Sequence, residues 1–229
     1  MEPSEGAKIK VTVNGPYLVS GSLPIARETI VTDDDGESVA WSEGEPYHEH
    51  PHYALCRCGA SHTKPFCDGS HMSAAFDGTE TAVRAPYDEL AEDIVGPELV
   101  LRDEVVLCAD ARFCHRGGGA WNLVKSDEDG NAKAVRLEAE LCPSGRYTAI
   151  DGKTGERFEP SLPPSVGIVA DPHEGVAGPL WVRGGVPVES ADGHVYETRN
   201  RVTLCRCGGS SNKPFCDGTH LETGFHDDE

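Results

Sequence analysis

The sequence predicts a mainly β protein with short helices, an α+β fold, and three observations support this. The 229 residues include 26 Gly and 16 Pro but only 7% aromatic residues, which favours turns and short strands over long helices. Several segments alternate apolar and polar residues and contain β-branched types, as half-buried strands do. One cysteine-rich segment occurs twice, which indicates two related units around a segment of different character.

The expected strands are short and lie mostly just upstream of the cysteine segments. The alternating segments are Ile9–Val13, Tyr17–Ser20, Val100–Leu107 and Leu180–Arg183. Asn14-Gly15-Pro16 is typical of a turn.

One helix is predicted in the middle of the chain, over Ala132–Leu141, with Ala134, Leu137 and Leu141 on one side. It should end at Cys142-Pro143. Residues 151–164, rich in Gly and Pro, are expected to form a linker back to the second unit.

The repeat is long enough to indicate a duplication. Residues 55–71 read LCRCGASHTKPFCDGSH and residues 204–220 read LCRCGGSSNKPFCDGTH, without a gap, at an offset of 149 positions. Phe76 and Phe225 each follow five residues after the last histidine, and GPYLVSGSLPI (15–25) corresponds to GPLWVRGGVPV (178–188). We therefore expect a first unit over 9–80, a small mixed α/β insert over 81–165 and a second unit over 166–229.

Each copy carries four metal-binding side chains in two pairs. Cys56 and Cys58 are two residues apart, so in an extended segment both side chains point the same way. Cys67 and His71 are four apart, which places them on one face of a helical turn. A two-iron cluster needs such a two-plus-two division of its ligands. In the second copy the corresponding residues are Cys205, Cys207, Cys216 and His220.

Other residues of the motif have expected supporting roles. Asp68 is a good N-cap for the turn, and Gly69 lets the backbone approach a cluster closely. The serines Ser61 and Ser210 either donate hydrogen bonds to a cluster sulfur or form turns. Gly59, Gly208 and Gly209 leave backbone N–H groups free to point at sulfur, and Pro65-Phe66 and Pro214-Phe215 are expected to cover the cluster with an apolar ring.

Cys56-Arg-Cys…Pro-Phe-Cys67-Asp-Gly-Ser-His71 and its second copy resemble the CDGSH iron–sulfur domain of the NEET family. The second copy departs only at Thr219, which leaves the ligands intact. The resemblance implies one [2Fe-2S] cluster per motif, hence two, with the histidine on the outer, more exposed iron. Single-motif members are two-fold dimers with a β-cap above the cluster-binding region. The tandem arrangement therefore implies two NEET-like units in an internal pseudo-two-fold dimer, and a monomeric chain.

The chain carries a formal charge of −19, which repels phosphate backbones and anionic lipids and argues against nucleic-acid or membrane binding. No stretch approaches the roughly 20 apolar residues that span a bilayer. Residues 1–6 lack the apolar core of a secretory signal and the Arg-rich character of a transit peptide. We therefore expect a cytoplasmic protein, in which nine cysteines serve as metal ligands rather than disulfides.

The expected function is electron transfer, or storage and transfer of iron–sulfur clusters, with a redox partner protein or an apo-protein acceptor. No enzyme is predicted, because the well-placed Cys–His pairs already belong to the motifs. The neutral imidazole ligand predicts loss of the cluster in mild acid. The alternative is a structural zinc-binding interaction protein that uses the same ligands, although zinc modules usually have Cys-x2-Cys spacing.

The middle segment contains three further cysteines, Cys108, Cys114 and Cys142. With Trp121 and the helix before Cys142-Pro143, they resemble, more weakly, a divergent single-cluster ferredoxin-like module over 100–150. They are one ligand short of a four-ligand set, which His115 would complete. We interpret them instead as buried small hydrophobic residues of a degenerate module. The histidines 48, 50 and 52 are interpreted as part of a solvated loop rather than as a weak metal site.

Overall fold

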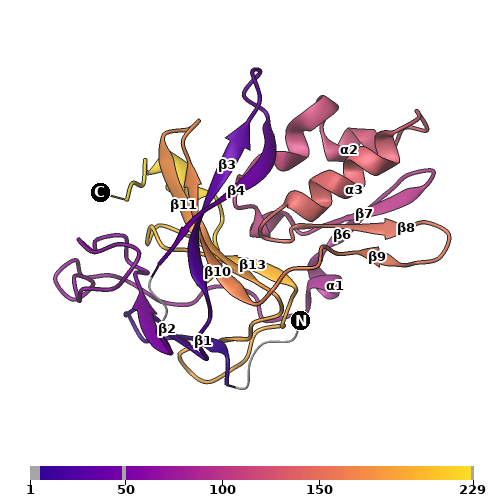
Figure 1. Cartoon of the computed structure of the whole chain (residues 1–229). Coiled ribbons are helices and arrows are strands. Elements are labelled where there is room, and N and C mark those ends of the chain that lie inside the picture. Colours follow the sequence, from indigo (N-terminus) through magenta and orange to yellow (C-terminus); the bar gives the residue numbers. More distant parts are fainter. Residues whose placement is uncertain (1–5, 48–49, 228–229) are drawn as a thin grey trace.

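A computed structural model describes residues 6–47 and 50–227 (Figure 1). The strands are β1 (Lys8–Val11), β2 (Tyr17–Ser20), β3 (Ile25–Thr32), β4 (Ser38–Pro46), β5 (His52–Leu55), β6 (Glu92–Val95), β7 (Leu99–Asp103), β8 (Tyr147–Asp151), β9 (Arg157–Phe158), β10 (Ser165–Asp171), β11 (Val176–Arg183), β12 (Val188–Glu189) and β13 (Arg201–Leu204). The helices are α1 (Tyr87–Leu90), α2 (Ala120–Leu123), α3 (Asn131–Leu141) and α4 (Thr219–Glu222), with 3-10 turns η1 (Val105–Leu107) and η2 (Phe113–Gly118). The mainly β prediction is confirmed.

Two sheets contain strands of both sequence repeats. The first has the order β12-β1-β2-β5, and the second has the order β13-β11-β10-β3-β4. In the first sheet, β12 comes from the second repeat and the other strands come from the first. In the second sheet, β3 and β4 come from the first repeat. Apart from β4, each strand of one sheet has a counterpart at the same place in the other: β12 and β3, β1 and β10, β2 and β11, β5 and β13.

Parallel pairing joins the exchanged strands to their host sheets. β1 pairs with β12 through Ile9 and Val188, and β10 pairs with β3 through Val166 and Ile25. All four side chains are buried in one apolar core that both repeats share. Neither repeat can bury its sheet edge or complete this core by itself, so the two predicted units fold onto a common β scaffold.

The middle segment forms its own layer beside this scaffold. Its sheet has the order β6-β7-β8-β9, and α2 and α3 cover one side of it (Figure 1). The second apolar core lies between sheet and helices and includes Leu101, Val135, Ala139 and Ala149.

The prediction of a strand over Val100–Leu107 is wrong in its second half. β7 ends at Asp103, and Val105–Leu107 form a 3-10 turn. The Glu104 carboxylate accepts a hydrogen bond from the Val106 N–H at 3.4 Å, which caps the turn and competes with strand pairing.

The predicted helix exists over Asn131–Leu141, but the side that carries Ala134, Leu137 and Leu141 is not the side that it buries. Val135, Glu138 and Ala139 are buried, whereas Leu137 is 43% exposed. Because Ala139 is small, the helix packs closely on β8. This close packing, rather than burial of the larger Leu137 side chain, decides which face of the helix points toward the sheet.

Residues 151–164 are not simply a linker. Asp151 ends β8, and Arg157–Phe158 return as β9 to pair with it. The other predicted strands are confirmed with small shifts: β1 stops at Val11, and Leu180–Arg183 is the second half of β11. The 14–16 turn is closed by the Thr12 N–H, which donates to the Pro16 carbonyl at 3.2 Å.

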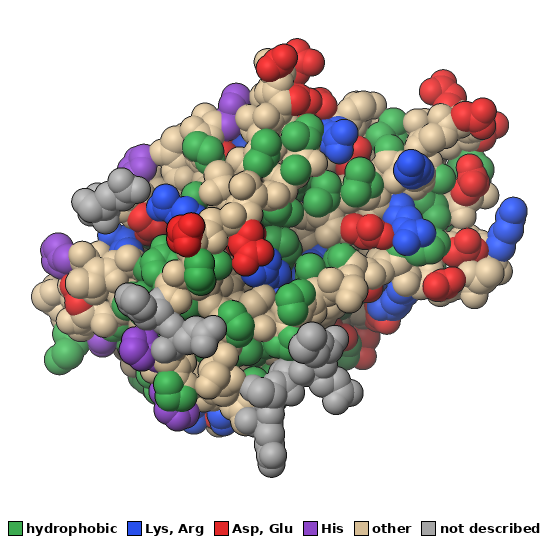
Figure 2. Space-filling model, viewed as in Figure 1, with side chains coloured by type: hydrophobic (Ala, Val, Ile, Leu, Met, Phe, Trp, Pro, Cys, Tyr) green, Lys and Arg blue, Asp and Glu red, His purple; other side chains and the backbone are tan. Residues whose placement is uncertain are grey.

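Acidic side chains gather on several protruding parts of the surface. Figure 2 shows them gathered near the tip of the β3–β4 hairpin and along the outer edge of the middle segment. Within the described residues, no helix has the length and apolar character needed to cross a membrane.

The fully buried Tyr17 ties the first repeat to the second, which yields a prediction. Its hydroxyl donates to the carbonyls of Cys205 at 2.7 Å and Pro214 at 3.0 Å. Tyr17→Phe should lower the free energy of unfolding by about 1–3 kcal/mol, because the buried Cys205 carbonyl loses this donor. The thermal midpoint should fall by about 2–4 °C per kcal/mol, measured by calorimetry on the iron-loaded protein.

Tyr53→Phe is the matched control. The Tyr53 hydroxyl donates to Leu23 within the first repeat and is only partly buried. An equal effect of the two variants would contradict a special role for the contact between repeats.

Candidate metal centres

In the first copy the structure brings the predicted ligands together as two pairs. The Sγ atoms of Cys56 and Cys58 are 3.8 Å apart, and Cys67 Sγ is 3.5 Å from Nδ1 of His71. Two donors on one tetrahedral metal with bonds of about 2.3 Å are separated by roughly 3.7 Å. Each pair therefore has the spacing of two ligands on a single iron.

The second copy repeats this geometry. Cys205 Sγ and Cys207 Sγ are 3.7 Å apart, and Cys216 Sγ is 3.6 Å from Nδ1 of His220. The same histidine nitrogen faces the cysteine in both copies.

Backbone pairing holds the two cysteine segments of each copy side by side. The Cys205 N–H donates to the Pro214 carbonyl and the Cys216 N–H to Thr203, both at 2.9 Å. Isolated β-bridges connect Leu204 with Phe215 and, in the first copy, Leu55 with Phe66. Strands β5 and β13 therefore end where the ligand pairs begin, and they bring residues eleven positions apart to one site.

The aspartate of each motif fixes the turn that carries the histidine. Asp217 accepts from the backbone N–H of Thr219 at 3.1 Å and of Ser211 at 2.7 Å. Asp68 makes the corresponding bonds, and these bonds lower its pKa. Each aspartate therefore closes its turn, but it is not the N-cap of a helix: among the described residues no helix directly follows Asp68, and α4 has Gly218 at its N-cap without a side-chain cap.

The glycine that follows the aspartate has a left-handed backbone in the first copy. Gly69 has φ of +90°, and a Cβ atom there would meet no described protein atom within 4 Å. The left-handed backbone by itself favours glycine at this position, and the close approach of the backbone to a cluster stays a prediction.

The two serines form turns and do not face the cysteine sulfurs. Ser61 Oγ donates to the Phe66 carbonyl at 2.6 Å, and Ser210 Oγ donates to Phe215 at 2.7 Å. Backbone N–H groups face sulfur instead. Ala60 donates to Cys58 Sγ at 3.4 Å and Gly209 to Cys207 Sγ at 3.5 Å, as predicted for Gly209. Such bonds stabilise the thiolate form that binds metal.

The phenylalanines pack inward rather than forming a lid. Phe215 lies in the shared core, edge-on to Tyr196 at 5.2 Å between ring centroids. Phe66 packs in the same way on Tyr47 and Tyr53. These rings therefore do not form the expected apolar cover over the cluster. They anchor each cysteine loop to the scaffold instead.

Sequence reasoning missed the arginine between the paired cysteines. Its side chain points away from the sulfurs and is 1% exposed in both copies. Arg57 donates to the carbonyls of Thr12 and Gly78 and lies 5.5 Å from the centre of the Phe76 ring. Arg206 similarly binds Gly178 and lies over Phe225. The available signal in the sequence was that the repeat continues past the motif to Phe76 and Phe225. Each of these rings packs on the Arg of its own copy.

The two sites differ in burial. Cys216 is buried and His220 is 4% exposed, whereas Cys67 and His71 are partly exposed. Burial lowers the pKa of His220 to about 4. Burial also raises the pKa of Cys216 well above its usual value, and that of Cys58 to about 11. Buried thiols of this kind need the positive charge of a metal to ionise, so both donor sets fit a metal centre.

The two sites touch through their backbones. A Cβ atom on Gly59 would lie 2.5 Å from the carbonyl oxygen of Cys207, and one on Gly208 would lie 2.6 Å from that of Cys58. Both glycines have positive φ, +78° and +83°. The contact is therefore reciprocal and admits no side chain.

The three middle cysteines line one cavity, together with Asp110, His115 and Arg146. Cys108, Cys114 and Cys142 are all partly exposed and form no disulfide. Burial raises the pKa of Cys114, and the neighbouring Cys142 and Cys108 raise it further. The three side chains are thus only partly buried and lie together, while their interpretation as small hydrophobic residues of a degenerate module stays a prediction. His115 is exposed and edge-on to Trp121 at 5.5 Å.

No three His, Cys, Asp or Glu side chains in the described part of the chain surround a point that would hold a single metal ion. The donors of each motif stay divided into two pairs. Of the histidines in the first loop, His50 and His52 are exposed, and His48 lies outside the described residues.

Comparison with protein families supports this assignment of the sites. The family described as iron-binding zinc finger of the CDGSH type matches residues 14–72 and 177–221. The family described as divergent 4Fe-4S mono-cluster matches residues 94–152. The chain therefore carries two CDGSH-type iron-binding regions with a divergent mono-cluster region between them. Neither the curated proteins nor the solved structures gave a match.

The reciprocal contact predicts that damage to one site reaches the other. Gly59→Ala should weaken iron retention at both CDGSH sites, because the new methyl group collides with Cys207. Gly155→Ala is the matched control, since Gly155 has φ of +75° and open space around it. In both variants, placing an alanine in the left-handed backbone conformation costs about 1–2 kcal/mol of stability. Equal iron-to-protein ratios in the two purified variants would contradict the prediction.

Proposed function

We propose that the protein binds one [2Fe-2S] cluster at each CDGSH site and acts in electron transfer or in cluster storage and transfer. The single observation that carries the proposal is the two-plus-two spacing of donors, repeated in both copies. Cys56 and Cys58 would hold one iron, and Cys67 and His71 the other; Cys205, Cys207, Cys216 and His220 would do the same. Bound there, the cluster supplies one-electron redox chemistry, and the imidazole ligand raises its potential above that of a four-cysteine site.

A structural zinc site with the same ligands is the alternative. It requires all four donors around one ion. The separation into two pairs supports the iron–sulfur assignment over zinc.

The chain itself would supply the scaffold that single-motif proteins obtain by dimerising. Equivalent strand orders in the two shared sheets and the reciprocal glycine contact support a pseudo-two-fold arrangement. We accordingly propose a monomer in a reducing compartment such as the cytoplasm, with a redox protein or an apo-protein as its partner. No catalytic residue is part of the proposal.

A second cofactor type is proposed for the middle region. The three cysteines that line one cavity, within a match to mono-cluster 4Fe-4S proteins, favour a [4Fe-4S] centre held by Cys108, Cys114 and Cys142. This revises the count from two clusters to three.

Metal and sulfide analysis tests the assignment. Anaerobically purified protein should contain about eight irons and eight acid-labile sulfides per chain if all three centres are filled. Cys142→Ser should lower both to about four, and Ser126→Ala should leave them unchanged as a surface control. Zinc without sulfide would refute the iron–sulfur function altogether.

The difference in burial predicts two phases of cluster loss in acid. A proton competes with iron for the histidine nitrogen, and burial makes protonation of His220 less favourable than that of a free imidazole, whose pKa is about 6.5. Falling pH should therefore empty the first site before the second, as followed by visible absorbance.

His71→Cys should slow the early phase and His220→Cys the late one, because a thiolate replaces the imidazole. Identical loss curves for both variants and the parent protein would exclude histidine protonation as the cause of acid lability.

A further inference from the structure

The loop that carries Cys108 lies directly against the second CDGSH site. A Cβ atom on Gly218 would be 3.6 Å from the Cys108 carbonyl oxygen and 3.4 Å from the Asp110 Cβ. Gly218 in turn donates its N–H to Cys216 Sγ at 3.5 Å. One carbonyl and one glycine therefore separate a ligand of the middle site from a ligand of the second site.

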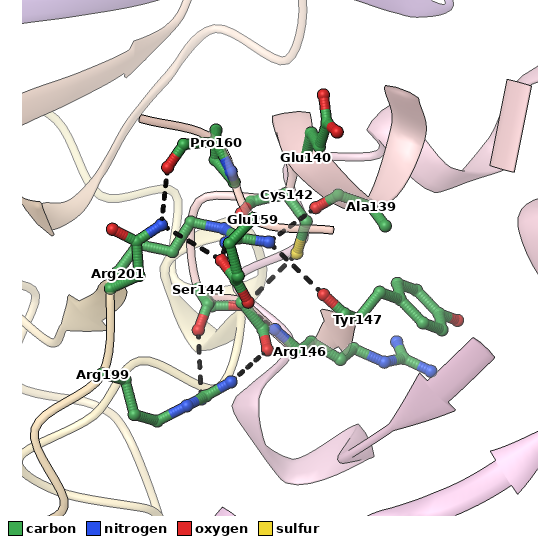
Figure 3. A network of polar contacts seen from close by, with 12 residues as sticks. Ala139, Glu140, Cys142, Ser144, Arg146, Tyr147, Glu159, Pro160, Arg199 and Arg201 are labelled. Atoms are coloured by element: carbon green, nitrogen blue, oxygen red, sulfur yellow. Dashed lines mark hydrogen bonds and ion pairs between the residues drawn. The ribbon is translucent and has the colours of Figure 1, made fainter. Parts of the chain in front are cut away.

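A second connection runs through β13. The Arg201 side chain is 1% exposed and donates to the carbonyls of Cys142 at 2.7 Å and Ala139 at 2.8 Å (Figure 3). Its own strand continues without interruption to Cys205. Arg199 holds the same loop through the Ser144 and Gly145 carbonyls. The Cys142 loop is thus fixed by residues just ahead of the second CDGSH motif.

An ion pair fixes the orientation of the Cys108–Cys114 loop. Arg112 Nη1 lies 2.8 Å from the Asp171 carboxylate, which is 2% exposed at the end of β10. In addition, the Asn212 side chain donates to the Val106 carbonyl at 3.0 Å. The middle site is therefore held rigidly on the second repeat.

Among the residues that the structure describes, the first CDGSH site has no such neighbour at the equivalent place. Gly69, the counterpart of Gly218, has open space around it, and His71 is partly exposed. The first site instead meets the second through the contact of Gly59 with Cys207 and of Gly208 with Cys58. The second site is thus the one that touches both others.

We propose that the three sites form a linear electron relay in the order middle site, second CDGSH site, first CDGSH site. This rests on the proposed function. A low-potential one-electron reductant reduces the middle site; that site loses its electron to the second site, which is reduced by one electron and passes it to the first. No bond forms or breaks and no proton is required. The partly exposed His71 side is where an oxidised acceptor protein takes the electron.

Magnetic resonance tests the relay on the complete protein. Full reduction with dithionite should make the centres paramagnetic, and adjacent spins broaden or split each other's electron paramagnetic resonance signals. His220→Cys and His71→Cys identify which signal belongs to which CDGSH site, because each changes one ligand. We expect Cys142→Ser to narrow the second-site signal to the width that coupling to the first site alone produces, and to leave the first-site signal unchanged. Cys114→Ser, at the other cysteine loop of the same cavity, should do the same if Cys142→Ser fails to fold.

The possible outcomes distinguish a failure of the relay from a failure of the proposed function on which it rests. A parent protein with about eight irons and an unbroadened second-site signal would overturn the relay alone. Broadening of the first-site signal that Cys142→Ser removes would overturn the proposed order. About four irons per chain, unchanged in Cys142→Ser, would overturn the third centre and the relay with it.

Discussion

The exchange of strands between the two repeats is the constraint on which the rest of the structure depends. Pairing of β1 with β12 and of β10 with β3 buries the edge of each sheet under a strand of the other repeat. Because parallel pairs need long connections, the two motifs must be far apart in sequence. The middle segment supplies that length and uses it to build a further site.

The shared scaffold determines how the cysteine loops meet. Strands β5 and β13 end side by side with the Pro-Phe segments, which sets the ligand pairs, and the buried arginines hold each loop from the opposite side. An arginine buried this deeply is tolerated because backbone carbonyls accept its protons and an aromatic ring packs on it. Contacts within the fold therefore hold each cysteine loop on both sides of the sulfurs.

Two equal sequence motifs become unequal sites in the folded chain. The middle segment packs on the second motif and leaves the first partly open, so His220 is buried and His71 is not. This asymmetry gives the proposed relay a direction and gives the two histidines different access to protons. A symmetric dimer of a single-motif chain would have no such difference.

The sequence by itself predicted the candidate ligands, the two pairs that they form in each copy and the mainly β class. Spacing of two and of four residues fixes local side-chain direction, and the repeat makes chance improbable. It did not determine the exchanged strands, the buried side of α3, the inward Phe66 and Phe215, or the cavity shared by Cys108, Cys114 and Cys142. Each of these depends on contacts between residues far apart in the chain, which no local pattern encodes. Only the tertiary structure therefore decided which of the sites lie in contact.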